Sequence, residues 1–401
     1  MASSRSEQEQ DKMTVMSEAF ISSEVLRWAR ERVKLPPDSL AEKLHVKLDK
    51  LLLWEKGEKH PTFLQAQKLA KVLHIPFGYL FLPHPPEESL PIPDLRTVGD
   101  HQTHEISPDL RDLLNDVLLK QDWYRDYLIE QSAEPLPFVH RFGLETPTGD
   151  IAADITRILD LTPEHRGEAR NGEEFLRLLM DKAENIGVMV MRSGIVGSNT
   201  HRVLDVHEFR GFAIVDDYAP VVFLNGKDAR AAQIFTLVHE LAHLWLGVSG
   251  ISDLSLDIES RHIHVKTERV CNMVAAEVLV PEKVFLAHWN SSRTLGENAG
   301  DLARLFRVST VVIARRAVDL RVVAWEEYHA FYAEQAQQWK STKKSKGGSP
   351  FKTIPVRNGR RFTDAVVRAA LEQRLLLRDA GRMLGLQPSN IGKLAREMGV
   401  A

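Results

Sequence analysis

The sequence has one cysteine among 401 residues, and this scarcity excludes a fold held together by internal disulfides. It has no run near the roughly 18 apolar residues that would cross a bilayer. The first twenty residues are polar and mixed in charge, without the apolar stretch of a secretory signal. These absences predict a cytoplasmic protein that does not enter a membrane. A hydrophobic share of 43% still supports real cores, and the length predicts two to four domains.

The formal net charge of -3 hides an uneven distribution of charge. From Lys340 to the end there are 14 Lys and Arg against 4 Asp and Glu, a balance of +10, which leaves -13 for residues 1–339. A basic terminal block on an acidic body predicts a polyanionic partner for that end only. DNA or single-stranded nucleic acid would be such a partner.

Helical periodicity dominates the chain, and one short region has the pattern of strands. Helices are predicted within 22–82, 106–133 and 300–340, and in the last fifty residues. From about residue 150, two helices precede the β-rich runs GVMVMRSGIV and EFRGFAIVDDYAPVVFLNG. A Pro-rich stretch near residues 82–100 indicates a linker. We therefore predict the α+β class, with a mainly helical multidomain chain around a small antiparallel sheet.

The strongest chemical signal is HELAH at residues 239–243, inside an amphipathic helix predicted to stop at Gly247. A spacing of four puts His239 and His243 on one helical face, where both can bind one tetrahedral zinc ion. Glu240 lies beside them and could act as general base on the water of the metal. The motif also occurs by chance in buried helices, so a third ligand is needed to support it.

Glu268 is the predicted third ligand, on a second apolar helix that ends at Pro281. It would complete a His-His-Glu site with a fourth position open for water. Asn272, one turn later, faces the same way and could hydrogen-bond a ligand histidine from behind. Two alternatives remain, because Cys271 is a competent zinc ligand and Glu277 is also acidic, although it is turned by about 180° from Glu268. Four more histidines are candidate transition-state donors or plain surface residues: His201, His207, His262 and His264.

The stretch FTLVHELAHLWLG followed by ERVCNMVAAEVLVP resembles the paired motifs of the ImmA/IrrE family of bacterial and phage metallo-endopeptidases. The preceding FRGFAIVDDYAPVVFLN is similar to the β-hairpins of that family, so the resemblance covers roughly residues 150–320. It implies a zincin-like protease that cleaves a helix-turn-helix repressor and thereby releases silenced genes. By motif position, it implies that Zn²⁺ is bound by His239, His243 and Glu268, with Glu240 as general base. Upstream, PIPDLRT resembles a junction between a repressor-like unit and the peptidase in longer members.

Three segments have the spacing of a helix-turn-helix. This motif needs a small residue where two helices cross, a tight turn four residues later, and apolar residues one and six positions beyond the turn residue. These positions are Ala41, His45, Val46 and Leu51 in the first segment, Ala303, Arg307, Val308 and Ile313 in the second, and Gly381, Gly385, Leu386 and Ile391 in the third.

The first segment resembles the Xre/Cro-like repressor family across residues 22–82, including WEKG at 54–57. The outward positions of its recognition helix are predicted to be Lys47, Leu48, Asp49, Leu52 and Leu53. Leucines lack the hydrogen-bond donors that read base edges, and an aspartate repels phosphate. DNA binding and a protein-docking surface therefore both remain open for this unit.

The third segment is the better DNA candidate, because it lies in the basic block and has Gly385 where a turn commonly needs a positive φ. Its candidate contacts are polar or basic: Gln387, Ser389, Asn390, Lys393 and Arg382. The alternative is a small solvated helical bundle. The second segment follows the peptidase-like region and is interpreted as a structural or substrate-binding subdomain.

These patterns divide the chain into seven predicted segments. They are a flexible tail (1–20), an Xre-like helix-turn-helix domain (21–83), a linker and helical connector (84–142), a zinc metallopeptidase domain (143–290), a helix-turn-helix-like subdomain (291–338), a basic linker (339–352) and a C-terminal helix-turn-helix unit (353–401). The predicted function is a zinc-dependent endopeptidase that cleaves a helix-turn-helix transcriptional repressor and so derepresses stress, prophage or toxin-antitoxin genes. The alternative is a DNA-binding regulator or toxin-antitoxin component that uses its peptidase domain for sensing or partner docking.

Overall fold

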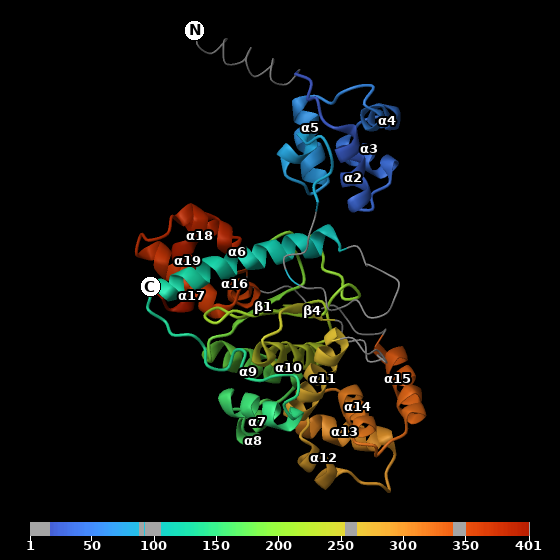
Figure 1. The fold of residues 1–401 in the computed structure, drawn as a ribbon, viewed down its shortest axis with the longest axis vertical. Coiled ribbons are helices and arrows are strands. Elements are labelled where there is room, and N and C mark those ends of the chain that lie inside the picture. Colours follow the sequence, from blue (N-terminus) through green and yellow to red (C-terminus); the bar gives the residue numbers. More distant parts are fainter. Residues whose placement is uncertain (1–16, 88–91, 93–105, 253–262, 340–349, 401) are drawn as a thin grey trace. The chain divides into compact units, whose positions relative to one another are not determined.

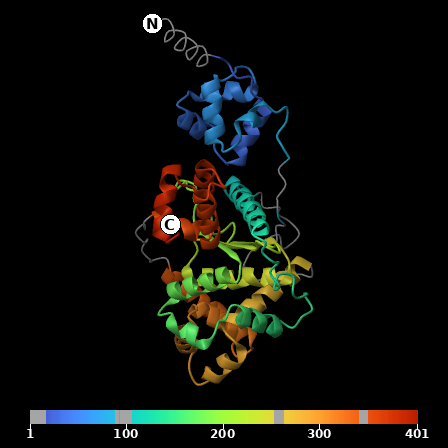
Figure 2. The same ribbon diagram turned by 90° about the vertical axis from the view of Figure 1, so that its left-hand side faces the viewer.

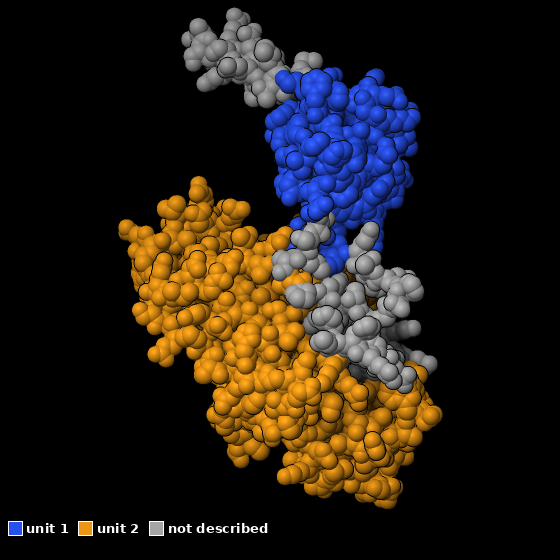
Figure 3. Space-filling view, viewed as in Figure 1, with its two compact units in different colours: residues 1–90, 105–112 blue, residues 91–104, 113–401 orange. Residues whose placement is uncertain are grey.

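The computed structural model describes residues 17–87, 92, 106–252, 263–339 and 350–400. The chain forms two compact units (Figure 3), of which unit 1 comprises residues 1–90 and 105–112, and unit 2 comprises residues 91–104 and 113–401. Helices dominate both units, and unit 2 contains a small sheet (Figure 1), so the predicted α+β class is confirmed. Within the described ranges, no helix has the length and apolar character to span a membrane.

Unit 1 is a bundle of short helices around the predicted helix-turn-helix, α3–turn–α4. The turn residue His45 has a φ of 57°, and the helices around it bury Ala41 and Leu51. The side chain of Thr62 accepts a hydrogen bond from Gln65 N and starts α5 with a capping box. The elements are α2 (Ser23–Arg32), α3 (Pro37–Leu44), α4 (Leu48–Lys56), α5 (Phe63–Val72) and the 3-10 helix η1 (Phe77–Phe81).

The predicted flexible tail at 1–20 is wrong for residues 17–20. The backbone N–H of Ala19 donates to Pro61 O at 2.8 Å, and that of Phe63 donates to Ser17 O at 2.9 Å. Ala19 is also buried in the core of unit 1. These backbone bonds and apolar contacts make the segment part of the domain, while residues 1–16 lie outside the described ranges.

The helices of unit 2 follow the predicted ranges closely. Ser107 caps α6, since its hydroxyl accepts a hydrogen bond from Leu110 N at 3.1 Å, and α6 enters unit 2 at Leu113. The helices are α6 (Pro108–Glu130), α7 (Thr148–Ile158), α8 (Pro163–Glu168), α9 (Gly172–Asn185), α10 (Arg230–Leu246), α11 (Ile263–Leu279), α12 (Glu282–His288), α13 (Leu295–Phe306), α14 (Thr310–Asp319), α15 (Trp325–Trp339), α16 (Pro350–Asn358), α17 (Arg360–Leu371), α18 (Leu377–Leu384) and α19 (Ile391–Met398), with the 3-10 helix η2 (Pro388–Asn390).

The sheet of unit 2 has four strands in the order β1-β3-β2-β4. The strands are β1 (Met189–Ser193), β2 (Gly211–Ile214), β3 (Val221–Asn225) and β4 (Gly250–Ser252). The predicted antiparallel pairing holds for β2 with β3 and for β2 with β4. It does not hold for β1, which pairs parallel to β3, so the sheet is mixed. β1 can run parallel to β3 because a long crossover connects the two strands. A tight hairpin would have made them antiparallel.

The sheet lies between α9 and α10 on one side and α6 with the C-terminal helices on the other (Figures 1 and 2). Helix α10 packs its apolar residues against β2 and β3 and is buried along most of its length. As predicted, it stops at Gly247, whose φ of 71° suits glycine. A Cβ there would also collide with the ring of His140.

A half-buried arginine, Arg166, contacts the second helix of the site, α11. The guanidinium of Arg166 in α8 donates to the carbonyl oxygens of Leu279 at 2.7 Å and Val278 at 3.1 Å, at the end of α11. It also donates to Phe306 O, at the end of α13, at 3.0 Å. A cation near helix C-termini satisfies carbonyl groups that have no partner within the helix. Arg166 therefore holds α11 in place relative to α13.

The C-terminal helices are packed onto the peptidase-like core and do not form a separate module. Phe362 of α17 is fully buried, with ring centroids 5.8 Å from Trp123 and 6.1 Å from Tyr124 on α6. Lys120 Nζ, also on α6, donates to Asn358 Oδ1 at 2.9 Å. The predicted basic linker at 339–352 ends too late, since α16 already begins at Pro350 and runs beside β1. Residues 340–349 of this predicted linker lie outside the described residues.

Candidate metal centre

Helices α10 and α11 bring three buried ligand-type side chains together. His239 and His243 come from successive turns of α10, and Glu268 comes from α11. Their exposed fractions are 0%, 0% and 2%. Among the described residues, these three are the ones whose ligand atoms gather as a metal ion would need.

The distances between the donor atoms suit one small cation. His239 Nε2 lies 3.1 Å from Glu268 Oε2, His243 Nε2 lies 3.2 Å from Glu268 Oε1, and the two Nε2 atoms are 3.1 Å apart. Ligand atoms at roughly 2.0–2.1 Å from a tetrahedral metal lie about 3.3 Å from one another. A metal ion at the centre of this group would therefore be held by His239, His243 and Glu268 at ordinary distances.

The protonation states of the site also fit a cation. Burial lowers the pKa of His239, more than the nearby Glu268 carboxylate raises it, which favours the neutral imidazole. Burial alone would raise the pKa of Glu268, but the charge and hydrogen bonds of His239 and His243 outweigh it and lower that pKa to about 2. Neutral imidazoles and an ionised carboxylate are the forms that bind a metal.

Glu240 lies in the same buried layer, under the first residue of β2. Its side chain is fully buried, and a Cβ placed on Gly211 would be 3.0 Å from Glu240 Oε1. The same Cβ would lie 2.5 Å from Thr236 Cγ2 and 2.9 Å from Phe223 O. Only glycine leaves room for this approach of the sheet to α10. Gly211 is not singled out by the sequence patterns, in which its one local signal is a glycine at the start of an otherwise apolar strand.

The structure separates Glu268 from the two alternatives weighed for the third ligand. Glu277 forms an ion pair with Arg316 of α14, on another side of α11. Cys271 is fully buried but does not join the group of ligand atoms. Burial raises the pKa of its thiol well above the usual value, and the carboxylates of Glu268 and Glu240 raise it further. A protonated thiol is a poor zinc ligand.

Asn272 lies one turn along α11 from Glu268, as predicted, and interacts with His239. This interaction raises the pKa of the imidazole slightly against the effect of burial. The Oδ1 atom of Asn272 has no hydrogen-bond partner among the described residues. Its predicted hydrogen bond to a ligand histidine therefore stays a prediction.

Two of the four further histidines have described side chains, and neither is among the grouped ligand atoms. His201 and His207 are exposed on the segment between β1 and β2. His262 and the side chain of His264 lie outside the described residues.

The C-terminal DNA candidates surround the predicted third helix-turn-helix, α18–turn–α19. Gly385 ends α18 with a φ of 64°. Arg382, Gln387, Ser389 and Lys393 are exposed, and Asn390 is half-buried. The structure thus places four of the five at the surface, as the sequence pattern predicts.

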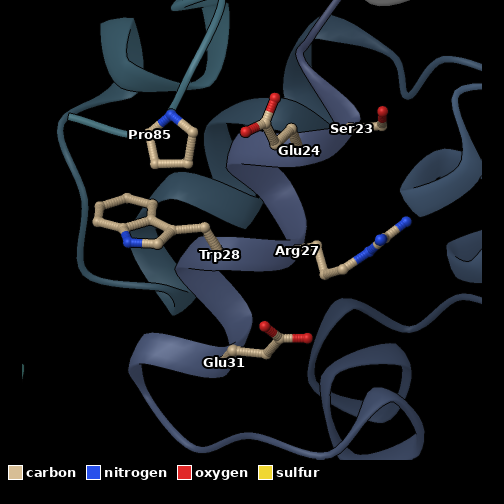
Figure 4. Close-up of a pocket in the computed structure, with 6 residues that line it drawn as sticks. All are labelled: Ser23, Glu24, Arg27, Trp28, Glu31 and Pro85. Carbon is tan, nitrogen blue, oxygen red and sulfur yellow. The ribbon is translucent and has the colours of Figure 1, made fainter.

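A surface hollow of about 390 Å³ lies in unit 1 and is not part of the metal centre (Figure 4). Pro85 and the ring of Trp28 form its apolar wall, with Glu24 and Glu31 at its ends (Figure 4). It contains none of the ligand residues, and we assign it no role.

Comparison with protein families matches three parts of the chain. Residues 183–318 match a peptidase family described as the IrrE N-terminal-like domain. Residues 26–80 match a helix-turn-helix family, and residues 358–397 match a domain of unknown function. A search of curated proteins finds no match.

These matches confirm the resemblance drawn from the motifs. The chain combines an ImmA/IrrE-type peptidase domain with an N-terminal helix-turn-helix domain of the Xre-like kind. Its architecture is therefore that of a peptidase joined to a regulator domain, with a buried His-His-Glu group in the peptidase part.

Proposed function

We propose that this protein is a zinc-dependent endopeptidase that cleaves a helix-turn-helix transcriptional repressor and so derepresses stress, prophage or toxin-antitoxin genes. The observation that carries the proposal is the convergence of His239, His243 and Glu268 at 3.1–3.2 Å beside the buried Glu240. Two imidazoles and one carboxylate are a donor set typical of catalytic zinc with an open fourth position.

Zinc, when bound, would polarise the scissile carbonyl and acidify a water molecule. The chain supplies the remaining chemistry. Glu240 directly follows His239 in the ligand-bearing turn of α10 and would take the proton from the water, then pass it to the leaving amine. The contact of Gly211 with Glu240 would hold that carboxylate in position, and the apolar packing of α10 would keep bulk water out.

The test is metal analysis combined with a cleavage assay on the repressor encoded by the neighbouring gene. We expect about one zinc per chain in the wild type, and a discrete pair of product fragments by mass spectrometry. Glu240→Gln should retain zinc and lose cleavage by about 100-fold or more, because general acid–base catalysis contributes on that scale.

Two matched variants complete the experiment. His239→Ala should lose both zinc and cleavage, whereas Glu282→Gln, an exposed change in α12, should lose neither. Unchanged cleavage by Glu240→Gln would overturn the role of Glu240, and cleavage by a zinc-free wild type would overturn the metal.

A second candidate is a regulator or toxin-antitoxin component that uses the peptidase domain for sensing or docking. It is favoured by the outward side of α4, where Leu48 is 40% exposed and Leu52 and Leu53 are half-buried. Under this hypothesis Leu48→Ser would abolish a complex with a partner protein, while Glu240→Gln would leave both the complex and the regulatory output intact.

A further inference from the structure

The C-terminal segment, which matches a domain of unknown function, ends in the third helix-turn-helix segment, α18–turn–α19. The N–H of Leu386 donates to Gly381 O at 2.8 Å, and a Cβ on Gly381 would lie 2.6 Å from Leu386 O. Gly381 therefore lets the turn that follows α18 fold back closely onto that helix, as the small residue of this motif does. Each helix is short, with Gly385 forming the left-handed turn between them.

Helix α19 buries one side and exposes the other. Ile391, Leu394 and Ala395 are fully buried against α17 and α18. The exposed side presents Gly392, Lys393 and Arg396 beside one acidic residue, Glu397, with Ser389 one turn earlier. The small residues on this side would let a nucleic-acid backbone approach closely. The basic residues would donate hydrogen bonds to phosphates and bases.

Only some of the basic side chains of this segment form ion pairs within the fold. Residues 350–400 contain 10 Lys and Arg against 4 Asp and Glu. Arg368, Arg374 and Arg378 form ion pairs with neighbouring carboxylates. Among the described residues, Arg382 and Arg396 form no such pair, and Lys393 lies 4.7 Å from the ring centroid of Phe351. Arg382, Lys393 and Arg396 thus place on α18 and α19 three basic groups without a carboxylate partner in the described part of the chain.

The other two helix-turn-helix segments present less suitable surfaces. The outward side of α4 carries Leu48 and Asp49 between the exposed Lys47 and Lys50, and α14 is enclosed by α13, α15 and the main core. We propose that the exposed side of α19, together with Arg382 and Gln387, binds double-stranded DNA in the major groove. This site does not depend on the peptidase activity proposed above.

The test is fluorescence anisotropy of the full chain with a labelled duplex of mixed sequence, over a series of salt concentrations. The variant Arg382→Ala/Lys393→Ala/Arg396→Ala should bind at least tenfold more weakly at low salt. The slope of log K against log salt should fall by up to about 2.7, because each phosphate contact contributes about 0.9. The matched control is Arg177→Ala/Lys283→Ala/Arg304→Ala, which removes three exposed charges from the peptidase part.

Weaker binding by the first triple variant, with unchanged binding by the control, would support the proposal. Equal losses in both variants would overturn it in favour of diffuse charge attraction. Equal binding of a single strand of the same length would overturn the assignment to duplex DNA, and so would binding by the first variant as tight as that of the wild type. Cleavage by the first variant should match the wild type, so failure here is distinguishable from failure of the peptidase proposal.

Discussion

Gly211 sets the distance between the sheet and the metal helix. Two of the three atoms that a Cβ would approach, Phe223 O and Thr236 Cγ2, belong to a backbone and to a short buried side chain. Neither can swing away, so the strand or α10 must move instead. The carboxylate of Glu240 would then move relative to the ligand histidines.

We therefore expect Gly211→Ala to lower stability by about 1–3 kcal/mol, as overpacking does, and to reduce cleavage more than zinc content. Thermal unfolding, metal analysis and the cleavage assay together measure this. Gly392→Ala, at an exposed helical position with no neighbouring atom in the way, is the control: it should leave zinc content and cleavage unchanged and should raise stability by up to about 1 kcal/mol, as Gly-to-Ala changes in helices do. Wild-type cleavage by Gly211→Ala would show that the close approach is unimportant.

The ligand histidines could be predicted from the sequence because their spacing within one helix is enough to place them on one face. Glu268 could be predicted only through helical phase and family resemblance, since it is far from them along the chain. Gly211, Arg166 and Asn358 could not be predicted, because their roles arise from contacts between distant segments.

At the scale of elements, contacts between distant segments again explain what could not be predicted, in this case the pairing of the strands. The start of α6 at Pro108 and the stop of α10 at Gly247 follow local rules and were predicted. The parallel pairing of β1 with β3 and the placement of α16 beside β1 depend on long-range packing that no local pattern encodes. Strand β4 is only three residues long and was not predicted.

The contact between α9 and α17 contains a buried carboxylate, Glu184. Its Oε1 accepts a hydrogen bond from the backbone N–H of Arg360 at 2.7 Å. Burial raises the pKa of Glu184 to about 7, although the N–H of Arg360 and the charges of Arg360 and Arg361 lower it. A carboxyl whose pKa is higher in the folded state contributes stability below its unfolded pKa and loses it as pH rises through the folded value.

We expect the contribution of Glu184 to be full below about pH 4.5 and lost by about pH 7, with a size of up to about 3 kcal/mol. Glu184→Gln keeps an acceptor for Arg360 and removes the titration. The difference in thermal midpoint between variant and wild type should therefore grow in favour of the variant across this range. The exposed change Glu168→Gln should give a difference that does not vary in this way, and a flat difference for Glu184→Gln would contradict the prediction.

At the scale of the whole molecule, the uneven charge does not mark a detached basic tail. The described part of the basic block is packed onto unit 2 through Phe362, Asn358 and Arg361. Removing it would expose the apolar surface around Trp123 and Tyr124 and would leave the buried Lys120 without its contact to Asn358. Its deletion is then a change to the core as well as to the charge.

A chain ending at residue 339 should therefore unfold at a temperature several degrees lower than the full chain. Phe362→Ala in the full chain should itself cost about 3–5 kcal/mol, as buried Phe-to-Ala changes do. Calorimetry or near-ultraviolet circular dichroism measures both. An unchanged transition in the shortened chain would mean that the contacts of α16 and α17 contribute nothing to the core.

The single thiol of the chain is buried beside the ligand helix, in the negative field of Glu268 and Glu240. A maleimide or disulfide reagent can react only after α11 separates from the helices packed against it, α7 and α10, because the thiol is buried and protonated in the closed state. The rate of labelling at Cys271 therefore measures how often α11 opens away from its neighbours. No engineered probe is needed for this measurement. Metal loading should lower the labelling rate, since a bound ion would join α10 to α11.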